Sequence, residues 1–143
     1  MKKTTVYDCS VIELPKIHNR AGNITPINGG IEVPFEIKRV YYLYDVPGGE
    51  ERGGHAHIEL QQFIIAAGGS FDVIIDDGKT KRTVHLCRPN MALHIVPGIW
   101  RELTNFSSGS ICLVLASTVY EEKDYIREYI DYLAFISRAN GKI

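Results

Sequence analysis

Short apolar runs alternate with turn residues along most of the chain. Runs rich in β-branched and aromatic residues favour strands, and glycine, proline and asparagine between them favour turns. The sequence predicts roughly ten short strands, the spacing of an all-β sandwich or barrel. The clearest runs are residues 11–14, 31–37, 39–46, 60–69, 70–77, 80–86, 92–96, 101–106 and 111–117.

The C-terminal stretch at residues 121–136 has a different pattern. Its larger apolar residues recur at helical spacing: Tyr125, Ile126, Tyr129, Ile130, Leu133 and Ile136. This spacing predicts a short amphipathic helix that packs on the sandwich or on a partner subunit. We interpret the stripe as core rather than as a ligand site.

Length and composition indicate one domain over residues 1–143, with ordinary apolar (45%) and charged (23%) content. A formal net charge of −1 excludes a global basic field for nucleic acid, so local basic residues must hold any anionic ligand. The N-terminus lacks a secretory signal, and no stretch is apolar enough to span a membrane. Three cysteines without CxxC spacing suit a reducing compartment, so we expect a cytoplasmic protein.

Two histidines, His55 and His57, lie two residues apart after a glycine pair. On an extended segment both side chains point to the same face. Such a pair binds a metal, moves protons or is a structural polar pair. The surrounding residues decide among these possibilities.

Those residues resemble the two motifs of cupins, which are small jelly-roll β-barrels. After His57, four residues lead to Gln62 and six more lead to a glycine. The later motif begins at Gly98 and continues to Arg101 and Asn105. The resemblance therefore implies an all-β cupin fold with a short C-terminal helical segment.

Two of the four metal ligands expected in a cupin are replaced. Gln62 stands where the motif has glutamate, and Arg101 stands where it has the last histidine. A glutamine amide is a weak ligand, whereas arginine keeps its proton and repels a dication. His85 and His94 have no spacing that recommends them as substitutes. We therefore expect no metal and no other cofactor.

The remaining groups suit proton transfer. A neutral imidazole is a good general base near pH 7, and its conjugate acid returns the proton. Arg101 can hold an anion or polarise a carbonyl oxygen, and Gln62 can orient a hydroxyl.

Longer stretches narrow the family. IKRVYYLYDVPGGEERGGHAH, LQQFI, IIDDG, VPGIWRELTNFS and DYIREY resemble the sugar-nucleotide 3,4-ketoisomerases of the WxcM-like cupin group. That resemblance implies an enzyme that moves the carbonyl of dTDP-4-keto-6-deoxyglucose from C4 to C3 through an enediol, for deoxyamino-sugar synthesis. It also implies no metal and a homodimer, commonly with a swapped N-terminal strand. The C4 configuration of the product, gluco or galacto, stays open.

The resemblance also suggests roles for single residues. His55 is slightly favoured as the base at C3, with His57 relaying protons or positioning the sugar. Tyr41 matches the tyrosine of the family, with Tyr42 and Tyr44 as alternatives. Substrate binding is assigned to Arg52, Arg101, Arg39, Gln62 and Arg20. Trp100 lines the pocket or belongs to the core, and Asn105 is interpreted as a turn residue.

Three other functions remain. A cupin epimerase acting on the same kind of sugar nucleotide would exchange protons beside the ketone without moving it. A metal cupin, such as a dioxygenase, would need the ligands that Gln62 and Arg101 replace. A non-catalytic sugar-nucleotide-binding cupin would need the basic pocket but not both histidines.

Overall fold

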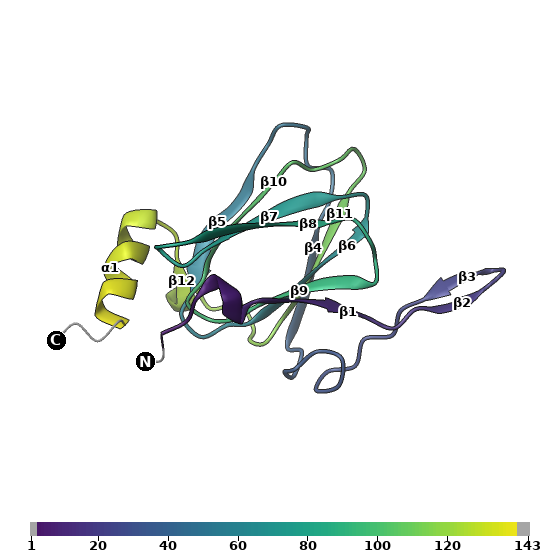
Figure 1. Ribbon diagram of the computed structural model, residues 1–143, viewed down its shortest axis with the longest axis horizontal. Coiled ribbons are helices and arrows are strands. Elements are labelled where there is room, and N and C mark those ends of the chain that lie inside the picture. Colours follow the sequence, from purple (N-terminus) through teal and green to yellow (C-terminus); the bar gives the residue numbers. More distant parts are fainter. Residues whose placement is uncertain (1–2, 140–143) are drawn as a thin grey trace.

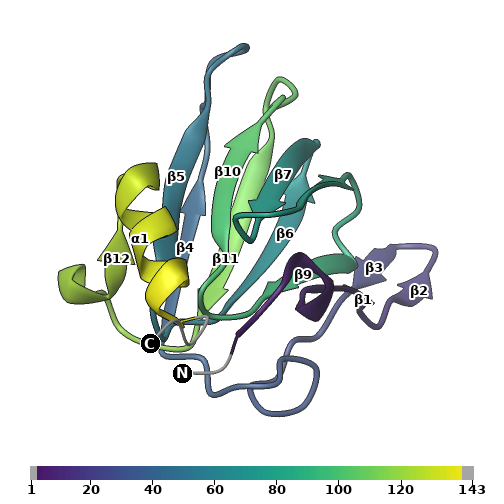
Figure 2. The same cartoon turned by 60° about the vertical axis from the view of Figure 1, so that its left-hand side comes forward.

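A computed structural model describes residues 3–139 as two antiparallel sheets that face each other (Figures 1 and 2). One sheet has the order β1-β9-β6-β11-β4 and the other the order β12-β5-β10-β7-β8. The first comprises β1 (Ser10–Glu13), β4 (Arg39–Leu43), β6 (Gln62–Gly68), β9 (Met91–Ile95) and β11 (Ile111–Ala116). The second comprises β5 (Arg52–His57), β7 (Phe71–Asp76), β8 (Lys81–Leu86), β10 (Trp100–Thr104) and β12 (Tyr125–Ile126). The predicted all-β, cupin-type jelly roll is confirmed.

The main core fills the space between the sheets. Strand β7 shows why, since Phe71, Val73 and Ile75 are fully buried and alternate with partly exposed residues. Alternating side chains of a strand point to opposite faces, so every second residue faces the other sheet. Ile64 and Val114 meet them from the first sheet.

A second apolar cluster covers the outer face of the first sheet. Val33 and Phe35 pack there against Phe63, Ile65 and other buried residues. The predicted strand at residues 31–37 is wrong, because this segment forms only an isolated bridge between Gly29 and Val33. Pro34 has no N–H for a ladder hydrogen bond, so the apolar residues pack as a loop.

The C-terminal segment folds in three parts. A 3₁₀ turn, η2 (Glu122–Asp124), leads into β12, and α1 (Tyr129–Ala139) follows. The predicted helix is thus confirmed only from Tyr129, because Tyr125 and Ile126 pair with His57 and Ala56 of β5. Residues 3–139 contain no helix long and apolar enough to cross a membrane.

The N-terminal part begins with a 3₁₀ turn, η1 (Val6–Asp8), before β1. A hairpin of β2 (Ile17–Asn19) and β3 (Gly22–Ile24) follows and projects from the sandwich (Figures 1 and 2). Ile17 and Ile24 are 56% and 62% exposed. The hairpin therefore presents apolar side chains without cover from the rest of the described chain.

The attachment of α1 gives a test of the fold. The buried Tyr132 hydroxyl lies 2.8 Å from the Gly98 carbonyl oxygen and 3.1 Å from that of Asp76. We expect Tyr132→Phe to lower the free energy of unfolding by about 1–2 kcal/mol, because a buried carbonyl loses its hydrogen-bond donor. Denaturant unfolding measures the loss. Tyr44→Phe is the control, since Tyr44 is 61% exposed; equal stability of both variants would contradict the prediction.

Candidate active site

A cavity of about 420 Å³ lies between the sheets. Strands β5 and β10 with Tyr125 form one wall, and β4, β6 and β11 form the other. Its polar lining residues are Arg39, Tyr41, Arg52, His55, Gln62, Arg101, Tyr125 and Arg127. This volume falls within the range of small-molecule sites.

The histidine pair lies on β5 at this cavity. His55 pairs in register with Arg101 of β10, and His57 with Tyr125 of β12. The two imidazole rings lie edge to face, with centroids 4.8 Å apart. His55 lines the cavity, whereas His57 lies directly behind it and is fully buried.

Asp124 contacts the inner histidine. Its Oδ2 lies 3.2 Å from Nδ1 of His57, and its two oxygens also accept hydrogen bonds from the backbone N–H groups of Glu59 and Leu60. A carboxylate on Nδ1 favours the tautomer with the proton there. Nε2 of His57, buried and without a hydrogen-bond partner among the described residues, then carries the lone pair.

The surroundings of His57 keep the imidazole neutral. Burial is the main cause, and the positive charge of Arg101 and the neighbouring His55 add to it, so that the pKa of His57 falls to about 2. The ring is therefore an unprotonated acceptor at neutral pH.

A buried hydrogen-bonded chain joins three residues of the opposite walls. Arg101, which is 1% exposed, donates through Nη1 to Oε1 of Gln62 at 2.5 Å. Gln62 donates through Nε2 to the Tyr41 hydroxyl at 3.1 Å. The Ile99 carbonyl accepts from the other side of the guanidinium. Burial lowers the pKa of Arg101 to about 10, so it remains charged at neutral pH.

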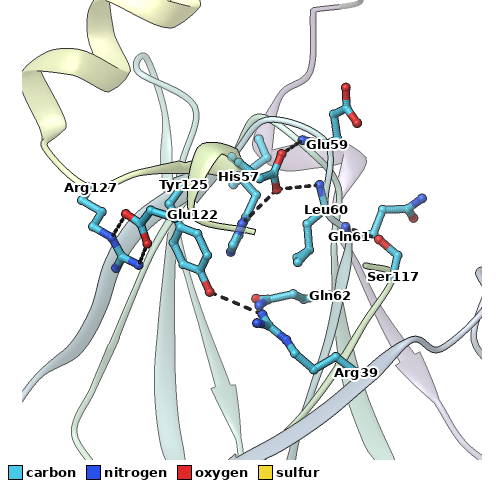
Figure 3. A network of polar contacts seen from close by, with 12 residues as sticks. Arg39, His57, Glu59, Leu60, Gln61, Gln62, Ser117, Glu122, Tyr125 and Arg127 are labelled. Atoms are coloured by element: carbon cyan, nitrogen blue, oxygen red, sulfur yellow. Dashed lines mark hydrogen bonds and ion pairs between the residues drawn. The ribbon is translucent and has the colours of Figure 1, made fainter. Parts of the chain in front are cut away.

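The cavity is strongly positive. Four arginines line it, and its described lining contains no carboxylate. Arg39 stacks on the Tyr41 ring. Its guanidinium also lies 3.4 Å from the Tyr125 hydroxyl (Figure 3). Arg127 covers the Tyr125 ring and forms two hydrogen bonds to Glu122. Such a site favours an anionic ligand.

The structure brings together all but one of the predicted site residues: His55, His57, Tyr41, Arg52, Arg101, Arg39 and Gln62. The exception is Arg20, which lies at the exposed turn of the β2–β3 hairpin and lines no described cavity of this chain.

The alternative residues lie elsewhere. Tyr42 and Tyr44 are exposed on the outer face, and Trp100 packs against Tyr129 and Tyr132 beneath α1. Asn105 has a positive φ of 58° after β10, which suits a turn. His94 contacts Gln61, and His85 contacts Asp72, so neither belongs to the cavity lining.

Three functional candidates escaped the sequence analysis: Asp124, Tyr125 and Arg127. Tyr125 was interpreted as part of a helical core stripe, which its place in the cavity wall contradicts. The DYIREY motif contains all three. This motif supports the family resemblance, but the sequence alone assigns no role to its individual residues.

The cupin metal position has a different chemistry here. Gln62 and Arg101 are hydrogen-bonded to each other, and the fixed positive charge of the guanidinium opposes the binding of a cation beside it. Residues 3–139 contain no group of three or more histidine, cysteine or acidic side chains arranged to hold a metal ion.

The fold and site together define a cupin with a histidine pair and an arginine-rich pocket for an anionic ligand. Comparison with known families is specific: residues 7–137 match the FdtA family, described as WxcM-like, C-terminal. The chain belongs to this family.

Characterised relatives carry consistent names. The TDP-4-oxo-6-deoxy-alpha-D-glucose-3,4-oxoisomerase of Aneurinibacillus thermoaerophilus is 41% identical over 130 residues, covering 91% of this chain and 94% of that protein. QdtA, a sugar 3,4-ketoisomerase from Thermoanaerobacterium thermosaccharolyticum solved with TDP, is 37% identical, with TM-score 0.91 and coverage of 94% and 98%. WlaRB, a TDP-quinovose 3,4-ketoisomerase from Campylobacter jejuni, is 42% identical, with TM-score 0.86 and coverage of 90% and 99%.

The depressed pKa of His57 predicts a pH-dependent stability. The unfolded chain takes up a proton near pH 6.5, whereas folded His57 does so only near pH 2, so stability falls as pH drops below 6.5. His57→Asn removes this dependence. When the pH is lowered from 6.5 to 5, we expect the free energy of unfolding of the parent protein to fall by about 2 kcal/mol more than that of His57→Asn.

Denaturant unfolding at several pH values measures this difference. His85→Asn is the control, because its side chain is 55% exposed. A parent and a His57→Asn variant that lose stability in parallel would contradict the prediction.

Proposed function

We propose that this protein is a TDP-sugar 3,4-ketoisomerase that moves the carbonyl of TDP-4-keto-6-deoxyglucose from C4 to C3 without a metal. The observation that carries the proposal is the cavity itself, which combines a histidine pair, a buried arginine and a tyrosine hydroxyl. The relatives named above support the substrate class.

The reaction needs only proton transfers. A base removes the C3 proton, the electron pair forms a C3=C4 double bond, and the C4 oxygen gains a proton to give an enediol. The C3 hydroxyl then loses its proton, C4 gains one, and the carbonyl stands at C3. The steps need a base that is unprotonated at neutral pH and donors for the developing oxyanion.

The geometry of the cavity keeps His55 as the base at C3, because it is the histidine of the pair that lines the cavity in which the sugar would lie. His57 lies behind His55 with the two rings edge to face, and Asp124 at Nδ1 fixes the orientation of the His57 ring. In this proposal His57 therefore positions the imidazole of His55 rather than contacting the sugar. Arg101 and Tyr41 face the same cavity from β10 and β4 and stabilise the negative oxygen.

The other arginines bind the diphosphate of the substrate in this proposal. Arg52 is exposed at the start of β5, at the rim of the cavity, and Arg39 faces it from β4. Within residues 3–139, only Arg127 of the four lining arginines forms a salt bridge with a carboxylate. Arg39 and Arg52 are therefore available for phosphate oxygens.

We also propose that the protein is a cytoplasmic homodimer. The three free thiols, Cys9, Cys87 and Cys112, suit a reducing compartment. The projecting β2–β3 hairpin supports the dimer, because a second copy would bury Ile17 and Ile24. In this arrangement Arg20 belongs to the cavity of the partner.

The activity is tested by incubating the protein with TDP-4-keto-6-deoxyglucose in heavy water and following the sugar by NMR, with and without chelator. We expect the ketone to migrate to C3 with deuterium at C4, and chelator to have no effect. His55→Asn should lower kcat about 10²–10⁴-fold, the usual contribution of a general base. His85→Asn, outside the cavity, is the matched control. A parallel reaction in ordinary water keeps the proton at C4, and its coupling to the C5 proton distinguishes the gluco from the galacto product.

Other results would select another function. Deuterium at C3 or C5 with the ketone still at C4 would identify an epimerase. Bound substrate without any exchange would leave a sugar-nucleotide-binding protein. Turnover abolished by chelator and restored by a divalent cation would contradict the metal-free mechanism.

The dimer is tested by sedimentation equilibrium. We expect a mass about twice the 16.1 kDa of the chain, and a monomer for Ile17→Asp combined with Ile24→Asp, because buried carboxylates oppose the interface. Val119→Asp is a control, since Val119 is also exposed but lies outside the hairpin. A monomeric parent would overturn the proposal.

A further inference from the structure

The hydrogen bonds between Arg101, Gln62 and Tyr41 have a direction fixed by chemistry. A guanidinium only donates, so the Gln62 side chain must face Arg101 with its oxygen, Oε1. The amide nitrogen, Nε2, then faces the Tyr41 hydroxyl. Because an amide nitrogen only donates, the Tyr41 oxygen must accept. Flipping the amide would place donors against Arg101, so no other orientation is consistent.

This direction determines what Tyr41 can do. Its oxygen accepts from Gln62, and its own O–H proton is not used in that bond. The residue lines the same cavity as His55. Burial raises the pKa of Tyr41, so the hydroxyl keeps its proton at neutral pH. The tyrosine is thus a neutral donor at the cavity wall.

We propose that Gln62 is a positioning residue for the isomerisation. It holds the Tyr41 hydroxyl as a donor into the cavity, where the proton stabilises the oxygen of the enediolate. The inference rests on the proposed isomerase activity and deepens it. It assigns to Gln62 a role through Tyr41, rather than a contact with the sugar.

The choice of glutamine over glutamate follows from the same reasoning. A glutamate at position 62 would accept from Arg101 and also from Tyr41, and so would capture the tyrosine proton. A methionine would accept no strong bond from Arg101 but would leave the tyrosine proton free. Among side chains of this length, the amide both satisfies Arg101 and donates to Tyr41.

Two variants separate this role from a structural one. Gln62→Glu gives Arg101 a carboxylate, so its unfolding temperature should match or exceed that of Gln62→Met. The kcat values should follow the opposite order, with Gln62→Met more active than Gln62→Glu. We expect kcat to fall about 100-fold in Gln62→Glu, as for loss of an oxyanion donor, and only about 10-fold in Gln62→Met. KM should stay within about threefold, because the donor acts in the transition state.

Gln61→Glu is the matched control. Gln61 is adjacent in the chain but contacts His94, outside the cavity lining, so its kcat should stay within about twofold of the parent. If kcat followed the unfolding temperature, so that Gln62→Glu had a higher kcat than Gln62→Met, the inference about Gln62 would be overturned. An active parent protein would still support the proposed isomerase activity in that case. An inactive parent would count against the proposed function instead.

Neutron diffraction of the deuterated protein tests the geometry independently of activity. We expect the Tyr41 deuteron to point into the cavity and both Gln62 amide deuterons to be on Nε2, one of them toward Tyr41. A Tyr41 deuteron lying between Tyr41 and Gln62 would overturn the inference, whatever the protein catalyses.

Discussion

The site depends on a charged Arg101 that is buried between the sheets without a carboxylate partner among the described residues. A buried charge is costly unless its donors are satisfied. The Ile99 carbonyl and the Gln62 amide accept from the guanidinium, but they leave its charge uncompensated. That excess charge favours an anion, or an oxygen that becomes negative, in the adjoining cavity. Because the guanidinium can only donate, the Gln62 side chain must also face Arg101 with its amide oxygen.

The C-terminal segment is as important to the site as the strands. Asp124 accepts the N–H groups of Glu59 and Leu60 just after β5 and also contacts His57. The Ile58 N–H bonds to the Asp124 carbonyl, and β12 continues the pairing. One residue therefore fixes the turn after β5 and the orientation of the inner imidazole. Docking of this segment and orientation of the His57 imidazole are consequently a single structural event.

Much of this site was accessible from the sequence, because its main residues follow local rules. Strand alternation correctly placed His55 and His57 together, and motif spacing identified Gln62 and Arg101. The failures have physical causes. The spacing of Tyr125 and Ile126 fits a helix, yet backbone pairing with β5 takes them into a strand. Asp124 lies 67 residues from His57, a distance that no periodic pattern spans. The loop at residues 31–37 looks like a strand by composition, but Pro34 opposes pairing.

The Gln62–Arg101 pair also suggests how a cupin cavity serves a reaction that a metal could assist. A metal ion would polarise the substrate carbonyl as a Lewis acid, and it would coordinate any substrate oxygen that came within reach. The guanidinium supplies a fixed positive charge instead, and its donors are directed by Ile99 and Gln62. Because a guanidinium cannot activate dioxygen or change oxidation state, the chemistry that Arg101 supports is polarisation of the substrate and proton transfer. Shifting a ketone along a sugar needs both and nothing more, so the replaced ligands are part of the specificity for this reaction.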